Sequence, residues 1–284
     1  MAVSNNLINF YKEDNDIWGK PQNYRGVDFY PITVSDTRAR ELFYEYICMP
    51  KNHFTDIHII KMSYLKFILF FVALKRTMNS GKTDDISFFN NIGVVLKEFQ
   101  EFLSLITHNK DVTIDCGWNF DVEKIREQKI IIKVGSINFS ESDFEIIREM
   151  ILVQNGMTLK SIEEYIPELE AKLSIKNKMN GEVTFADNIF VFCSLLKKIP
   201  AEIENCTLYQ LKRQLARLNR IQEYELYKPL EVSGQISFKN GDTIKDYMHM
   251  DEPTGRYDSI RINKEDFINK NSIFRDESIK KQGS

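Results

Sequence analysis

The chain has 284 residues, enough for one large domain or for two domains of ordinary size. Hydrophobic residues make up 43% and aromatic residues 12%, a composition that supports a packed core and excludes a wholly disordered chain. The formal net charge of -3 excludes a strong overall attraction to nucleic acid or to an anionic membrane surface.

The first predicted element lies in residues 24–33, where aromatic and aliphatic side chains alternate. This pattern predicts a short strand, and Pro31 confines it to a sheet edge or a strand end because proline donates no backbone hydrogen bond. Ser35 or Asp36 then offers an N-cap for a helix that ends near Met49. If a partner strand pairs with this half of the chain, the predicted edge is the first place where we expect the pairing.

Two long helices and two strands follow. Residues 56–78 predict one helix that is apolar on nearly all sides and therefore central to the core. Residues 88–106 carry apolar side chains at three- and four-residue spacings, which predicts an amphipathic helix. The β-branched runs at 112–117 and 129–139 predict two strands, which join residues 24–33 in a small sheet.

The second half of the chain is marked by helix-start signals. Ser140, Thr184 and Thr207 are predicted N-caps, and Pro167 fits the first turn of another helix. The helix after Thr207 is the longest clear one, with leucines along one side. Residues 234–248 predict a strand or a hairpin.

These elements predict an α+β protein that is predominantly helical and has a small antiparallel sheet. The expected organisation has four parts. They are an N-terminal arm (1–23), an N-terminal helical domain with the small sheet (24–139), a C-terminal helical domain (140–250) and a polar, weakly ordered tail (251–284).

No motif for a catalytic, cofactor-binding or metal site emerges, so we expect a protein that is not an enzyme. The sequence GKT at 81–83 lacks the glycine that a phosphate-binding loop needs at position 76. The histidines lack metal-ligand spacing, and the scattered cysteines are typical of reduced thiols in an intracellular protein. A nucleophile assembled only by the fold, such as Cys116 with His108, stays open.

No membrane segment is expected either. The most apolar run, residues 62–74, is too short to span a bilayer and is interrupted by Lys66. The first residues also lack the basic and apolar regions of a secretion signal.

Two groups of side chains are candidates for binding a partner protein. The aromatic residues Phe70, Phe71, Phe88 and Phe89 either complete the core or lie partly exposed in a groove that accepts an amphipathic helix.

The second group is a basic stripe opposite the leucines of the last helix. It consists of Lys212, Arg213, Arg217 and Arg220. Such a stripe is a solvated helix face, a surface for an acidic protein partner, or a phosphate-binding surface. Nucleic acid is the weakest of these three interpretations because no aromatic residues interleave the basic ones for base stacking.

Several segments together resemble proteins encoded among the tail genes of phages that infect low-GC Gram-positive bacteria. The segments are YRGVDFYPITVSD (24–36), MPKN (49–52), KMSYLKFIL (61–69), INFSESDFEIIREMILVQNG (137–156), TFADNIFVF (184–192), CTLYQLKRQL (206–215) and SGQISFK (233–239). The resemblance covers roughly residues 24–250 and rests on helix caps and apolar positions.

This resemblance implies a non-enzymatic phage tail or baseplate assembly protein, either an assembly chaperone or a structural component. Its implied partners are phage tail proteins such as a tape-measure, tube or baseplate protein. Its implied location is the host cytoplasm or the virion, with no cofactor and with the oligomeric state open. The alternative is a nucleic-acid-associated regulatory protein that uses the basic stripe.

Overall fold

The computed structural model describes residues 7, 10–54, 56–81, 85–116, 129–164, 166–180 and 184–234, without the side chains of 85, 86, 89, 173 and 175–180. The strands are β1 (Gln22–Tyr24), β2 (Val27–Phe29), β3 (Val112–Asp115), β4 (Ile131–Val134) and β5 (Ile137–Phe139). The helices are α1 (Glu13–Ile17), α2 (Thr37–Tyr46), α3 (Ile57–Lys61), α4 (Tyr64–Asn79), α5 (Asp85–Thr107), α6 (Glu141–Gln154), α7 (Leu159–Glu163), α8 (Pro167–Asn180), α9 (Phe185–Leu196), the 3-10 helix η2 (Pro200–Ile203) and α10 (Leu208–Val232). The predominantly helical α+β class is confirmed.

The strand predicted over residues 24–33 is instead a hairpin of β1 and β2. Arg25 and Gly26 form its two-residue turn, and both have positive φ angles (52° and 87°). A turn of this kind matches the right-handed twist of the flanking strands, so the chain reverses where the sequence suggested a continuous strand. Pro31 follows β2 and lies outside both strands.

Strands β3, β4 and β5 form a separate antiparallel sheet with β4 in the centre. The single strand predicted over residues 129–139 is therefore two strands, which reverse at Gly135 (φ 57°). The expectation that residues 24–33 join this sheet was wrong, because β1 and β2 pair only with each other among the described strands.

The helix predicted over residues 56–78 is broken into α3 and α4. Met62 is extended (ψ 145°), and the side chain of Ser63 accepts a hydrogen bond from the backbone N–H of Lys66, which begins a new helix. A serine hydroxyl in this position competes with the helical backbone for hydrogen bonds. Helix α4 supplies many core residues, whereas α3 has no buried residue.

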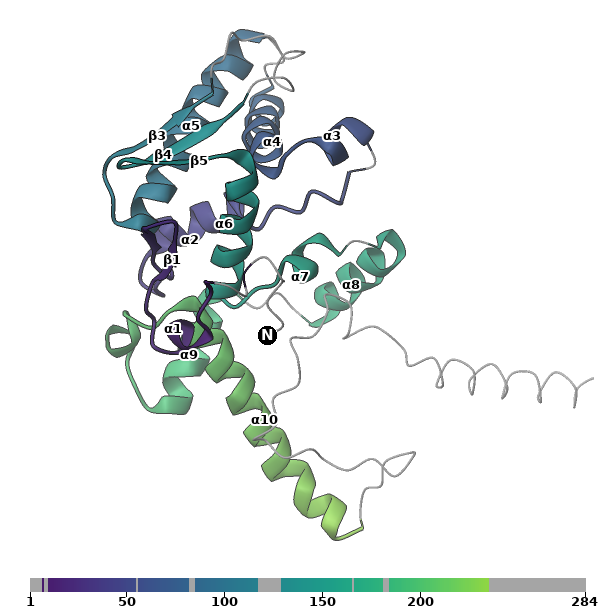
Figure 1. Ribbon diagram of the computed structural model, residues 1–284. Helices are drawn as coiled ribbons and strands as arrows, with labels where there is room; N and C mark the ends of the chain where they lie inside the picture. Colours follow the sequence, from purple (N-terminus) through teal and green to yellow (C-terminus); the bar gives the residue numbers. More distant parts are fainter. Residues whose placement is uncertain are drawn as a thin grey trace, which may run out of the picture. The chain divides into compact units, whose positions relative to one another are not determined.

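The main core is built from α2, α4, α5 and α6, which contact one another and the sheets (Figure 1). It continues across residue 139, where the sequence suggested a domain boundary, because Phe144 of α6 packs on Tyr64 of α4 and Phe99 of α5. Leu7, from the predicted N-terminal arm, is also fully buried in this core.

Contacts divide the chain into two compact units. The described residues up to Glu163 belong to the first unit together with those from Thr184 onward. Helix α8 belongs to the second unit. This division does not coincide with the boundaries expected from the sequence.

The predicted helix starts are confirmed. Asp36 caps α2, and Ser140, Thr184 and Thr207 each form a capping box at the start of α6, α9 and α10. Pro167 is the first residue of α8. The hairpin expected at 234–248 and the tail expected at 251–284 lie outside the described residues, apart from Gly234.

A buried arginine holds together the segment that follows α2. Arg148 of α6 is 3% exposed and donates hydrogen bonds to the carbonyl oxygens of Ile47 and Met49, each at 3.1 Å. Its guanidinium also pairs with Glu163 at 2.7 Å and lies 3.4 Å from the ring centre of Tyr64. All four partners are therefore tied to one buried cation.

Arg148→Ala tests this network. We expect a loss of about 2–4 kcal/mol in the free energy of unfolding, because the carbonyl oxygens of Ile47 and Met49 lose their buried donor and the half-buried Glu163 loses its ion pair. Urea unfolding followed by circular dichroism measures the loss, with the exposed Lys160→Ala as control. If Arg148→Ala does not fold, Arg148→Lys should fold with reduced stability. A change of less than about 0.5 kcal/mol would show that Arg148 is not a central support.

Asp143 connects the first hairpin to α6. It accepts hydrogen bonds from the backbone N–H of Ser140 (2.8 Å), the hydroxyl of Tyr24 (2.9 Å) and the guanidinium of Arg25 (2.8 Å). Burial alone would raise the pKa of Asp143, but these hydrogen bonds outweigh it and hold the pKa below the ordinary value of 3.8. The ionised form is therefore favoured in the folded state.

Asp143→Asn should lower stability by about 1 kcal/mol at neutral pH through the weakened cap. A lowered folded pKa contributes stability that is complete above the ordinary pKa and is lost as pH falls through the folded pKa. The difference between native protein and variant should therefore shrink below about pH 3.8. Urea unfolding across this pH range measures it, with the exposed Asp111→Asn as control. A difference independent of pH would contradict the assigned role.

Candidate functional site

Helix α9 is apolar on two sides but is covered on only one. Phe192 and Cys193 are buried in a small second core, which they share with Val34, Ile203 and Leu211. On the other side Phe190 is 61% exposed, and the exposed Val191 follows it. Contiguous exposed apolar side chains of this size commonly mark a contact surface.

The exposed side of α9 adjoins a cavity of about 630 Å³, which we call the apolar groove. The start of α2, helix α9 and η2 line it, and its main apolar residues are Val34, Phe185, Ile189, Phe190 and Pro200. Ile199 follows α9 and is 62% exposed, so it adds to the apolar surface of this region.

Arg40 places a fixed positive charge in the wall of the apolar groove. Its guanidinium lies 4.0 Å from the ring centre of Phe185 and donates a 2.8 Å hydrogen bond to the carbonyl oxygen of Val34. A cation stacked on an aromatic face keeps its orientation at low cost in side-chain entropy. Glu204 lines the same groove, which is therefore apolar with one charge of each sign among its lining residues.

Backbone pairing joins two distant segments of the chain beside the groove. Val34 donates from its backbone N–H to Cys206 (2.8 Å), and Leu208 donates to Ile32 (2.9 Å). An isolated bridge joins Thr33 to Thr207. Residues 32–35, at the end of the stretch considered for strand pairing, are thus engaged within the chain.

The predicted aromatic group packs largely inward. Phe88 is 8% exposed and contacts Phe70 edge to face at 5.5 Å, while Phe71 packs on Phe54 at 4.9 Å. Phe70 and Phe71 are half-buried against the main core. Phe89 lies in α5, and its side chain is outside the described residues. A role of these residues in partner binding stays a prediction.

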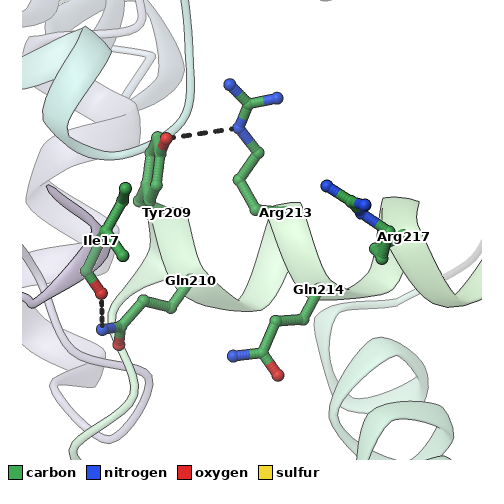
Figure 2. A pocket seen from close by; sticks show the side chains of 6 residues that line it. All are labelled: Ile17, Tyr209, Gln210, Arg213, Gln214 and Arg217. Atoms are coloured by element: carbon green, nitrogen blue, oxygen red, sulfur yellow. Dashed lines mark hydrogen bonds between the residues drawn. The ribbon is translucent and has the colours of Figure 1, made fainter. Parts of the chain in front are cut away.

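The predicted basic stripe is divided by the structure. Lys212 turns inward and its ammonium donates to the carbonyl oxygen of Asn155 at 3.1 Å, and burial lowers the pKa of Lys212. Arg220 pairs with Glu223 at 3.5 Å. Arg213 and Arg217 line a common cavity on α10 (Figure 2).

The apolar groove was not recognised from the sequence. The sequence predicts one apolar stripe for the helix after Thr184, made of Phe185, Ile189, Phe192, Cys193 and Leu196, and this stripe leaves out the exposed Phe190 and Val191. The available signal was the uninterrupted apolar run from Ile189 through Cys193, which exceeds what one helix face accommodates.

The described residues also bear on the metal site and the cysteine nucleophile considered from the sequence. No group of three or more histidine, cysteine or acidic side chains there is placed to hold a metal ion, and the four cysteines are free thiols. Burial and nearby Asp115 raise the pKa of Cys116 to about 11, which disfavours a thiolate nucleophile. The ring of His108 stacks on Tyr30 at 3.9 Å.

No helix in the part of the chain that the structure describes is long and apolar enough to cross a membrane. Comparison with known proteins adds no family: no family model, curated protein or solved structure matches this chain.

The apolar groove should bind a dye that fluoresces on exposed apolar surface. We expect Phe190→Ser to lower the fluorescence of the bound dye, because Phe190 is a large exposed aromatic side chain of this surface. Ile60→Ser, which changes a 51% exposed residue on α3, should leave it unchanged. Titration of the native protein and of both variants with the dye measures these effects. Equal fluorescence from native protein and Phe190→Ser would contradict dye binding in this groove.

Proposed function

We propose that this protein is a non-enzymatic phage tail or baseplate assembly protein that acts in the host cytoplasm and binds a helical segment of another tail protein. The observation that carries the proposal is the exposed apolar side of α9 beside a preformed groove. The resemblance of residues 24–250 to proteins encoded among phage tail genes supports the biological setting.

The chemistry of the groove favours an amphipathic helix as its occupant. The nearby backbone of residues 32–35 is already hydrogen-bonded to residues 204–208, so this stretch offers no free edge for strand addition. Recognition must then depend on side chains, as in the docking of a helix into a groove. The client helix would place apolar residues against Phe185, Ile189 and Phe190.

Charges around the groove restrict the client further. Arg40 lies in the wall, and the exposed lysines Lys197 and Lys198 follow the end of α9. An acidic residue beside the apolar stripe of the client helix would complement these cations, and a basic residue would complement Glu204, which lines the same groove. Such charges mainly set orientation and the rate of association, while the apolar contacts supply the binding free energy.

Co-expression with the neighbouring tail proteins tests the proposal. We expect a complex with one of them, and Phe190→Glu should reduce the recovered complex about tenfold or more, because a carboxylate in an apolar contact loses its hydration. Ile60→Glu introduces the same charge at a similarly exposed residue on α3 and should leave recovery unchanged.

Circular dichroism establishes that both variants fold, and size-exclusion chromatography with light scattering gives the mass of the complex. A native protein that stays solitary among all the tail proteins would contradict the proposed function. Full recovery with Phe190→Glu would instead place the contact outside the apolar groove.

A further inference from the structure

A second cavity lies where the C-terminal end of α1 meets the first turns of α10. It has a volume of about 350 Å³ and is lined by Ile17, Tyr209, Gln210, Arg213, Gln214 and Arg217. We call it the arginine cleft. Among the described residues, its lining contains two guanidinium groups, two amides, a phenol and one aliphatic side chain, and none of them is a carboxylate.

Contacts between α1 and α10 give the cleft a defined shape. The amide of Gln210 donates a 2.8 Å hydrogen bond to the carbonyl oxygen of Ile17, which attaches the end of α1 to α10. Figure 2 shows Tyr209, Arg213 and Arg217 projecting from α10 along the cleft. The cleft is therefore formed by two elements that the chain itself holds together.

Arg213 is oriented by one neighbour and keeps most of its donors available. Its Nε donates a long 3.4 Å hydrogen bond to the hydroxyl of Tyr209, and its guanidinium carbon lies 5.5 Å from the ring centre of Tyr209. No carboxylate pairs with Arg213 among the described residues. An orientated guanidinium of this kind binds a planar carboxylate through two parallel hydrogen bonds.

Apolar side chains beside the cleft indicate that the ligand is more than a small anion. Ile17 is half exposed, and the next residue, Trp18, is 71% exposed. Tryptophan, tyrosine and arginine are the residue types that carry most binding energy in protein interfaces. A peptide that presents a carboxylate and an apolar side chain next to each other would use both parts of this surface.

The surrounding charges argue against an extended polyanion. Glu13 and Asp14 are exposed on α1, just before Ile17, and would repel a continuous phosphate backbone. Lys212, the fourth cation of the predicted basic stripe, is turned away toward Asn155. A ligand with one carboxylate brings less negative charge near Glu13 and Asp14 than a nucleic acid strand does.

We propose that the arginine cleft binds an acidic segment of a partner protein, with a glutamate or aspartate of that segment held by Arg213, beside Arg217, and an apolar neighbour packed on Ile17 and Trp18. This surface is distinct from the apolar groove and does not depend on the proposed function. It gives the protein a second means of contacting a partner.

The probe is a fluorescent peptide with one glutamate–leucine pair in an otherwise glycine–serine sequence, titrated with the full chain and followed by fluorescence polarisation. We expect saturable binding that weakens about tenfold in Arg213→Gln and further in the double variant Arg213→Gln/Arg217→Gln, because a charge-assisted bidentate contact is lost. Lys133→Gln removes one exposed positive charge on β4 and should bind like the native protein.

Three further measurements test whether apolar contacts contribute, whether the apolar groove is involved, and whether the ligand is a nucleic acid. A glutamate–serine peptide should bind more weakly than the glutamate–leucine peptide if Ile17 and Trp18 contribute. Phe190→Glu should leave peptide binding unchanged, which separates this site from the apolar groove. Absence of binding, equal binding by the double variant, or stronger and steeply salt-dependent binding of a single-stranded oligonucleotide would each overturn the proposal.

Discussion

The rest of the structure depends on one constraint, the backbone pairing between residues 32–35 and residues 204–208. These segments are far apart in the sequence, and closing such a long loop has an entropic cost that local helix formation does not have. Each segment leads directly into a capped helix, α2 after Asp36 and α10 after Thr207. The pairing therefore places the starts of both helices next to each other and brings α9 beside α2.

Two kinds of surface follow from this arrangement, and their chemistry differs. The apolar groove combines a floor of large side chains with the stacked guanidinium of Arg40, so it favours the apolar side of a helix. The arginine cleft offers hydrogen-bond donors from Arg213 near the exposed Trp18, which is the basis for proposing a carboxylate with an apolar neighbour as its ligand. A protein that gathers other proteins into an assembly gains from two such surfaces, because linked contacts strengthen binding without any new interaction.

The interior shows how the described part of the chain keeps these surfaces in place. Arg148 links the segment after α2 to α6 and α7, and Asp143 links the first hairpin to the start of α6. Both are charged groups with several hydrogen-bond partners, which is the condition under which burial of a charge is tolerated. Lys212 makes a similar link between α10 and the end of α6.

The amino-acid sequence by itself determined the helical character, the caps at Ser140, Thr184 and Thr207, and the amphipathic face of α5. These features depend on residues within one or two helical turns of each other. Only the tertiary structure decided that Phe190 is exposed and that Lys212 leaves the basic stripe. Periodicity shows which residues share a helix face, but it does not show which of two apolar faces another segment covers, or which carbonyl group lies within reach of a lysine. Those outcomes depend on contacts between segments that are distant in the sequence, and no local pattern encodes them.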